Sequence, residues 1–221
     1  MIVLPFGAEQ IELMPTKIVC IAKNYRAHAH EMHETVPAEP QIFLKPPSAL
    51  IGDKGAVVLP KKSKRVDHEV ELAVIMQSRC THISPIKARR SVLGYTITVD
   101  ITARDIQAEA KKRGMPWTIA KGFDTFAPVG PRIVPAKSID PSDLPIWLTV
   151  NGDMRQQSTT KHMIHTVEHI ISFVSHIMTL EPFDIICTGT PAGVGPLRDG
   201  DTVEAGIDGI GILRFRVTQE F

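Results

Sequence analysis

Residues 66–75 read VDHEVELAVI and place two carboxylates where a strand normally carries core side chains. In a β-strand successive side chains alternate between the two faces, so Glu69 and Glu71 share one face, with their Cβ atoms roughly 7 Å apart. A solvated face would explain a lone Glu-x-Glu, but here Ala73 and Ile75 continue the same face with apolar side chains. Two like charges in an enclosed site raise each other's pKa unless a cation lies between them. This stretch therefore predicts a site for a hard divalent metal.

A third carboxylate ends the next long strand pattern. Residues 94–102 alternate between apolar side chains and a face that carries Thr96, Thr98 and Asp100. If this strand lies beside the first, three carboxylates converge and leave coordination positions open for water and a substrate. An isolated aspartate at a strand end carries little information, whereas three carboxylates on two adjacent strands indicate a metal site.

A short polar helix predicted at residues 26–34 carries candidate acid–base residues. On this helix His28 and Glu31 are neighbours at i,i+3, and His30 with Glu34 is an equally good pair. A carboxylate can hold an imidazole in one tautomer and stabilise its protonated form, which a water-activating base requires. Spacing alone leaves both pairs open, and it also leaves open a surface helix whose histidines have no function.

Two lysines and a glycine-rich loop have features of an anion site. Lys45 ends a strand and precedes two prolines, which would hold its charge in place. Lys121 lies among small residues in a loop-like stretch, residues 114–124, where a ligand can approach. The loop at residues 188–196 lets backbone amides and threonine hydroxyls come close to an anion, although such loops are more often plain turns. It is not a P-loop, because no Gly-Lys-Ser/Thr follows it.

Many short strands and few helices predict a strand-rich α+β fold. We expect one catalytic domain at residues 17–221, preceded by an N-terminal strand or hairpin at residues 1–16. The apolar stripe of the longest predicted helix, residues 161–178, belongs to the core. The other predicted elements are helices at 26–34 (with Asn24 as a candidate N-cap), 84–92 and 105–113, and strands at 17–22, 41–44, 57–60, 146–150, 154–157, 184–187, 202–205 and 210–217.

The overall charge argues for a small partner. The chain has 25 basic and 24 acidic residues, so its net charge of +1 gives no case for nucleic acid or an anionic membrane. The three cysteines are far apart and lie in apolar runs, which indicates buried thiols in a reducing compartment. No basic leader or membrane-length apolar run is evident, so we expect a cytoplasmic protein.

Taken in order, the motifs resemble the fumarylacetoacetate hydrolase superfamily, most closely its short, single-domain acylpyruvase-like members. The resemblance covers nearly the whole chain from Lys17 onward. The family fold is a mixed, strand-rich roll or distorted barrel with a few helices, usually assembled as a homodimer, so the resemblance implies both for this chain. The motifs that carry it are KNY at 23–25 with His28 and Glu31, FLKP at 43–46, HEVELAV at 68–74, DITARDIQ at 100–107, WTIAKGFD at 117–124 and TGTPAGVG at 188–195.

The resemblance also implies roles for individual residues. His28, and not His30, matches the family pattern. Many relatives have Gly-Arg where this chain has Ala22 and Lys23; lysine keeps the charge but lacks the planar fork that suits a carboxylate. The implied site has Glu69, Glu71 and Asp100 holding Mg²⁺ or Mn²⁺ (or Ca²⁺ in their place), His28 and Glu31 as the water-activating dyad, Lys121 as a further catalytic residue, and Lys23, Asn24, Lys45, Gln107 and Thr190 as substrate contacts.

The implied reaction is hydrolysis of the C–C bond of an acylpyruvate, a 2-oxo acid, to pyruvate and a carboxylate. The same enolate-stabilising site could decarboxylate or tautomerise oxaloacetate, or isomerise a 2-hydroxyhepta-2,4-diene-1,7-dioate-type substrate. A protein that binds metal and 2-oxo acids without catalysis is an alternative from another class. Nickel or zinc storage through His28, His30 and His33 is weaker, because no further residue completes a ligand set at suitable spacing.

Overall fold

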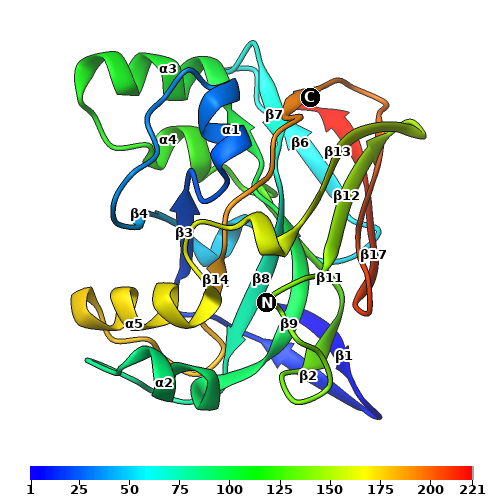
Figure 1. Ribbon diagram of the computed structural model, residues 1–221. Coiled ribbons are helices and arrows are strands. Elements are labelled where there is room, and N and C mark those ends of the chain that lie inside the picture. Colours follow the sequence, from blue (N-terminus) through cyan, green and yellow to red (C-terminus); the bar gives the residue numbers. More distant parts are fainter. Residues whose placement is uncertain (221) are drawn as a thin grey trace.

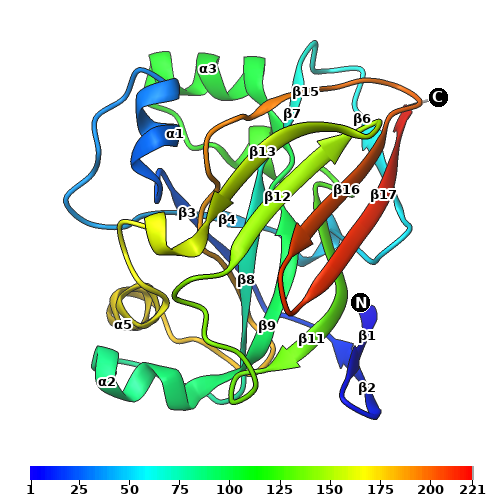
Figure 2. The same ribbon diagram turned by 45° about the vertical axis from the view of Figure 1, so that its right-hand side comes forward.

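A computed structural model describes residues 1–220, and its strands form three sheets (Figure 1). The largest sheet has nine strands in the order β2-β1-β11-β9-β8-β14-β3-β4, with β5 paired to β11. A five-stranded sheet, β13-β12-β16-β17-β6, packs against it through contacts of β12 with β8 and of β16 with β9 (Figure 2). A small sheet, β10-β7-β15, completes the curled half-barrel. The predicted strand-rich α+β fold is confirmed.

The elements have the following bounds. The strands are β1 Ile2–Phe6, β2 Glu9–Leu13, β3 Ile18–Ala22, β4 Gln41–Lys45, β5 Leu50–Ile51, β6 Ala56–Leu59, β7 Val66–His68, β8 Val70–Met76, β9 Val92–Val99, β10 Thr102–Ala103, β11 Ala127–Pro135, β12 Pro145–Val150, β13 Asp153–Thr159, β14 Ile185–Cys187, β15 Gly195–Leu197, β16 Thr202–Ile207 and β17 Gly211–Gln219. The α-helices are α1 Arg26–Glu31, α2 Pro85–Ala88, α3 Arg104–Arg113, α4 Thr118–Lys121 and α5 Val167–Ile177, with 3₁₀ turns at Pro47–Ala49, Arg89–Ser91 and Thr160–His162.

Strand β8 lies in the middle of the largest sheet, and all its residues are buried. A strand covered on both faces needs apolar side chains on both, which β8 has everywhere except at Glu71. Val70 and Leu72 belong to the main core cluster, whereas Ala73 and Ile75 belong to a second cluster on the opposite face. Glu71 therefore alternates with its neighbours as the sequence indicates, and it shares a face with the second cluster.

Three predicted helices are shorter in the structure, and one of them, α2, ends at Ala88 and continues as a 3₁₀ turn to Ser91. Helix α5 begins at Val167 and not at residue 161, because the Thr166 side chain caps it by accepting a hydrogen bond from the His169 N–H. Met163 also packs against the core, so the apolar periodicity continued beyond the helix itself. Helix α1 ends at Glu31 and not at residue 34.

Two local predictions are also wrong. Asn24 does not cap α1: the N-cap position is Tyr25, and the Asn24 amide instead donates to the backbone oxygens of His165 and Thr188 at 3.0 and 2.8 Å. The stretch at residues 114–124, expected as a loop, contains the helical turn α4. Because α4 is only four residues long, its periodicity leaves no clear pattern in the sequence.

The N-terminal residues form a hairpin that extends the largest sheet. Strands β1 and β2 pair antiparallel, β1 pairs parallel with β11, and Leu4 and Leu13 are buried in the second cluster. The predicted domain division at residue 17 stays a prediction, and Phe221, its last residue, lies outside the described residues. No helix among the described residues is long and apolar enough to cross a membrane.

Candidate functional site

The structure brings the three predicted metal ligands together beneath α1 and α3. Antiparallel pairing of Val70 with Val99 sets β8 beside the end of β9, where Asp100 follows. Glu69 lies between β7 and β8, and its backbone oxygen accepts the Asp100 N–H at 2.7 Å. One carboxylate oxygen from each of Glu69, Glu71 and Asp100 lies within 4.8 Å of the others, and the three residues are only 5%, 2% and 1% exposed. Such a group of hard oxygen donors suits Mg²⁺, Mn²⁺ or Ca²⁺.

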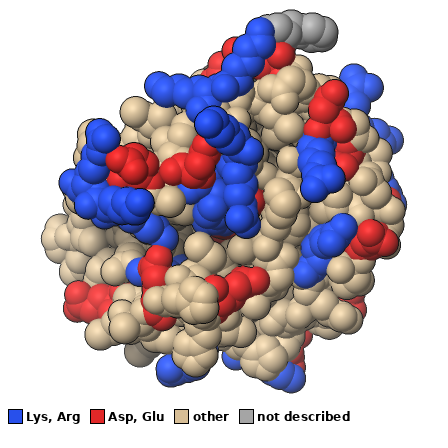
Figure 3. All heavy atoms as spheres, turned by 90° about the horizontal axis from the view of Figure 1, so that it is seen from above, with Lys and Arg blue, Asp and Glu red and all other residues tan. Residues whose placement is uncertain are grey.

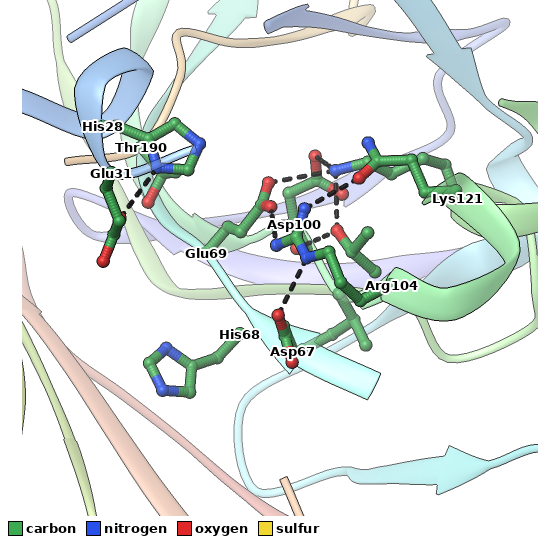
Figure 4. Close-up of polar contacts among 12 residues, drawn as sticks. His28, Glu31, Asp67, His68, Glu69, Asp100, Arg104, Lys121 and Thr190 are labelled. Atoms are coloured by element: carbon green, nitrogen blue, oxygen red, sulfur yellow. Dashed lines mark hydrogen bonds and ion pairs between the residues drawn. The ribbon is translucent and has the colours of Figure 1, made fainter. Parts of the chain in front are cut away.

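Lys121 contacts two of these carboxylates (Figure 4). Its Nζ lies 3.0 Å from Glu69 and 2.6 Å from Asp100, and it also donates to the Thr102 hydroxyl at 2.6 Å. Burial lowers the pKa of Lys121, but Asp100 and Glu69 outweigh it, so the net pKa is raised and the ammonium stays charged. All three of its N–H donors have partners, so Lys121 supplies the site with positive charge.

Arg104, at the start of α3, ties the carboxylate cluster to β7. Its guanidinium donates to Glu69 at 2.5 Å and to Asp67 at 2.8 Å, and it also reaches the Gln107 side-chain oxygen at 2.8 Å (Figure 4). Burial raises the pKa of Glu69, but Lys121 and Arg104 outweigh it and hold that pKa far below its usual range. Glu69 is therefore ionised at neutral pH.

The pKa of Glu71 is shifted in the opposite direction. Among residues 1–220 it has no ion-pair partner, and its carboxylate accepts one backbone hydrogen bond, from the Gly189 N–H at 2.7 Å. Burial raises its pKa well above the usual value, and the nearby Asp100, Cys187 and Glu69 raise it further. A buried carboxylate with a single donor fits a metal site, because a cation at this place would supply the missing charge.

The structure selects one of the two histidine–carboxylate pairs. His28 is buried, and its Nδ1 lies 3.2 Å from Glu31 Oε2, whereas His30 is exposed and Glu34 pairs with lysines instead. The other Glu31 oxygen accepts the Gly193 N–H at 2.9 Å, so the glycine-rich loop orients this carboxylate. A segment far along the chain therefore helps to hold the Glu31 carboxylate beside His28.

At Gly189 the glycine-rich loop lies very close to the chain at Asn24. Gly189 has a φ of +97°, and a Cβ at this position would lie 2.7 Å from the Asn24 Cβ. The next residue, Thr190, donates its hydroxyl proton to the Val70 oxygen at 2.9 Å and accepts from the Gln156 amide at 2.8 Å. Gln156 also contacts His68 Nδ1 at 3.0 Å, and Figure 4 shows His68 directed away from the carboxylate cluster.

A cavity joins most of the predicted site residues. Neither Asn24 nor Lys45 lines it, and both are fully buried. Lys45 Nζ lies 2.8 Å from Asp100 Oδ1 and donates to three backbone oxygens. The positions of Asn24 and Lys45 therefore do not support direct contact of either residue with a substrate. Glu31 also lies outside the lining and acts on the cavity through His28. The predicted residues that do line the cavity are Lys23, His28, Glu69, Glu71, Asp100, Gln107, Lys121 and Thr190.

Several residues of the cavity wall were not among the predicted site residues. Arg104 had a usable signal, because three buried carboxylates require nearby cations and Arg104 follows Asp100 by four positions. Lys111 and Trp117 also line the cavity, but they come from separate segments and no spacing rule connects them. Glu34, which the sequence offered only as a partner of His30, lines the cavity as well.

Three comparisons place these features among known proteins. Residues 17–218 match the family model described as fumarylacetoacetate (FAA) hydrolase C-terminal. The mitochondrial oxaloacetate tautomerase FAHD1 of Bos taurus is 46% identical over 200 residues, which is 90% of either chain. The crystal structure of fumarylpyruvate hydrolase from Pseudomonas aeruginosa in complex with Mn²⁺ and pyruvate has a TM-score of 0.94 at 32% identity, covering 99% of this chain and 96% of that one.

A third relative has isomerase activity in its name. The crystal structure of 2-hydroxyhepta-2,4-diene-1,7-dioate isomerase from Mycobacterium marinum has a TM-score of 0.85 at 43% identity, covering 99% of this chain and 77% of that one. Proteins with hydrolase and isomerase names thus have a similar fold, and a protein with a tautomerase name has a similar sequence. The chain is a single-domain member of the fumarylacetoacetate hydrolase family of enzymes.

Proposed function

We propose that this protein is a metal-dependent enzyme that acts on 2-oxo acids through their enol forms, and that it interconverts the enol and keto forms of oxaloacetate. The observation that carries the proposal is one cavity lined by three buried carboxylates, the charged Lys121 and His28, whose ring nitrogen Glu31 contacts from behind the wall. The 46% identity to an oxaloacetate tautomerase supports this choice of reaction.

Glu69, Glu71 and Asp100 are the residues that would hold the metal, and Glu71 lacks a cation of its own. When bound, Mg²⁺ or Mn²⁺ would supply Lewis-acid polarisation of the 2-oxo acid oxygens. A neighbour with Mn²⁺ and pyruvate in its structure supports this ligand pair. Ca²⁺ would suit the same oxygen donors.

The chain's own residues would orient the substrate and move the proton. Lys121 adds positive charge at the cavity wall, and this charge favours binding of the electron-rich enol form of the substrate over binding of uncharged compounds. Because Glu31 engages Nδ1 of His28, Nε2 is the nitrogen that remains to exchange a proton with the substrate. In enol-to-keto conversion the enol O–H loses its proton and the C2–O bond becomes C=O, while the C2=C3 bond becomes single and C3 gains a proton. His28 serves as the base or acid for one of these transfers.

Hydrolysis of acylpyruvates is the second candidate, favoured by the dyad geometry. An imidazole oriented by Glu31 can take a proton from water, which then attacks the distal carbonyl. The C–C bond breaks, its electron pair forms pyruvate enolate, and protonation at C3 yields pyruvate. The similarity to a fumarylpyruvate hydrolase supports this reaction. Oxaloacetate decarboxylation and dienoate isomerisation would use the same cavity.

One substrate panel distinguishes these functions. The purified protein with Mg²⁺ or Mn²⁺ is given enol-oxaloacetate, acetylpyruvate and fumarylpyruvate, and loss of enol absorbance and release of pyruvate and CO₂ are followed. We expect accelerated loss of the oxaloacetate enol without CO₂. Faster turnover of acylpyruvates than of oxaloacetate would favour hydrolysis, and binding without any turnover would favour a non-catalytic 2-oxo acid-binding protein.

The His28→Ala variant tests the proton-transfer role. We expect turnover of the preferred substrate to fall by about 10²-fold or more, the usual contribution of a positioned acid–base group. His30→Ala is the matched control, because His30 is exposed on the same helix and does not line the cavity. Equal activities of the two variants would exclude His28 as the acid–base residue.

A further inference from the structure

We propose that the groove between the β12–β13 turn and β15 is a second ligand site, and that it binds a small anion that keeps an O–H group, of which monohydrogen phosphate is the simplest. The groove has a volume of about 570 Å³, and none of its lining residues in the described part of the chain also lines the catalytic cavity. Figure 3 shows the molecule from above, the end at which this turn and β15 lie in Figure 2, and Lys and Arg side chains lie among Asp and Glu side chains on that face.

One ring nitrogen of His68 faces this groove and has no partner. The Gln156 side-chain oxygen accepts the Val70 N–H at 3.1 Å and lies 3.0 Å from His68 Nδ1, so Nδ1 carries the ring proton and donates it to the same oxygen. In the neutral ring Nε2 then has a lone pair and no proton. His68 is only 1% exposed, and its Nε2 has no hydrogen-bond partner among residues 1–220. A ligand that contacts this nitrogen must therefore donate a hydrogen bond.

Gly195 leaves space beside this nitrogen. A Cβ built at Gly195 would meet only His68 Nε2 within 4 Å, at 3.6 Å, apart from its own chain neighbours. Both residues line the groove, so a ligand atom at this place would need to shift by only about 0.6 Å to reach hydrogen-bond distance from Nε2. Gly195 does not have a positive φ, so alanine can stand at this position without backbone strain.

Two guanidinium groups give the groove its preference for anions. Arg155 and Arg198 line it and are exposed, and Asp201 is the acidic residue of the lining. The Asp201 carboxylate already accepts the Arg198 N–H at 2.7 Å and the Asn151 amide at 2.8 Å. Among residues 1–220 no ion pair joins the Arg198 side chain, and Arg155 contacts Asp153 at 3.4 Å with half of its own side chain exposed. Two positive charges and one negative charge favour an anion, and both arginines are free to turn toward it.

The lone pair of His68 Nε2 distinguishes between anions of equal charge. Sulfate has only acceptor oxygens at neutral pH, so it can pair with the arginines but would place a lone pair against the lone pair of Nε2. Monohydrogen phosphate accepts hydrogen bonds from the guanidinium groups through its other oxygens and donates its O–H to Nε2. The two anions have nearly the same size and shape, so the O–H group is the difference between them.

Phosphate and sulfate therefore form a matched pair of probes. Their binding is measured by calorimetry in the presence of Mg²⁺ at about pH 8, where an ordinary imidazole side chain is neutral and phosphate keeps one O–H. We expect phosphate to bind the unmodified protein about tenfold more tightly than sulfate, or better. Equal affinities, or binding of neither anion, would overturn the proposal.

The Gly195→Ala variant tests the position of the site. Its methyl group would fill the space beside His68 Nε2 at an ordinary contact distance, so phosphate affinity should fall about tenfold or more while the thermal unfolding temperature changes little. Gly52→Ala is the matched control, because a Cβ there meets nothing within 4 Å and Gly52 lies outside the groove. It should bind phosphate as the unmodified protein does. Phosphate binding that persists in Gly195→Ala would show that the anion lies elsewhere, such as at the metal, and would overturn the proposal.

The Arg198→Met variant tests the contribution of charge. It removes one guanidinium group and leaves the space beside His68 Nε2 intact, so both anions should bind about threefold or more weakly, with phosphate still preferred. Arg113→Met, on α3 and outside the groove, should leave both affinities unchanged. Unchanged phosphate affinity in Arg198→Met would also overturn the proposed anion site.

Discussion

At the scale of single residues, Glu71 links the stability of the protein to its proposed metal. Its carboxylate is 2% exposed, has a raised pKa and receives one hydrogen bond. Such a group destabilises the metal-free fold and becomes favourable when a cation is bound.

The Glu71→Gln variant separates these two effects. Glutamine keeps an oxygen for the Gly189 N–H but removes the charge, so in EDTA the variant should unfold at the same or a higher temperature than the unmodified protein. With Mn²⁺ at about 100 times its Kd the unmodified protein should gain about 2.7 kcal/mol, and the variant should gain almost nothing. Thermal unfolding in both conditions measures this, and equal stabilisation of both proteins by Mn²⁺ would contradict it.

Arg104 shows what a buried cation contributes to the same cluster. Arg104→Met leaves Glu69 and Asp67 without this partner, so we expect the free energy of unfolding to fall by about 3–5 kcal/mol in urea titrations. Arg113→Met, at the other end of α3, removes an exposed ion pair with Glu109 and should cost less than about 0.5 kcal/mol. Similar losses from both variants would show that burial of the guanidinium is not the cause.

At the scale of elements, the loop after β14 depends on glycine for a specific reason. Gly189 and Gly200 both have positive φ, +97° and +85°, but a Cβ at Gly189 would collide with Asn24, while one at Gly200 meets nothing within 4 Å. Only the first glycine joins the loop to the turn between β3 and α1. This junction sets the positions of Thr190 and of the amide that binds Glu71.

Alanine substitutions at the two glycines separate backbone strain from the steric clash. Gly200→Ala should cost about 1 kcal/mol from its backbone conformation alone. Gly189→Ala should cost clearly more, and it should also weaken Mn²⁺ binding, because the loop must move away from Asn24. Urea unfolding and Mn²⁺ titration of both variants test this, and equal stability losses with unchanged Mn²⁺ affinity would refute the steric argument.

At the scale of the whole molecule, the N-terminal hairpin supports the sheet without contributing to the cavity. Removing residues 1–14 would expose the edge of β11 and eliminate the buried side chains of Leu4 and Leu13. We expect a loss of about 3–6 kcal/mol from these two side chains and more aggregation through the free edge. Mn²⁺ affinity of the folded fraction should be unchanged; a large change would show that the hairpin shapes the site.

The homodimer stays a prediction, which light scattering would test against twice the 24.4 kDa chain mass.

Much of the fold and of the carboxylate cluster could be predicted from local patterns. Alternation along residues 66–75 assigned Glu71 to the face of Ala73 and Ile75, and the structure separates the two faces into two core clusters. The start of α5 and the role of Asn24 could not be predicted in this way. Met163 packs on the core without being helical, and the partners of Asn24 lie more than 140 positions away.

By itself, the sequence determined the fold class and the family motifs, because these depend on side-chain periodicity and on residues a few positions apart. It predicted that the three carboxylates converge only on the condition that two strands far apart in the chain pair, which they do in the sheet. Only the tertiary structure decided that His28 pairs with Glu31, that Arg104 compensates Glu69, and that Glu34 lies between Lys23 and Lys111. The last contact joins the segment after β3, the segment after α1 and the helix α3. Side chains from such separate segments meet only when the sheets and helices pack, because no local energy term relates their positions in the chain.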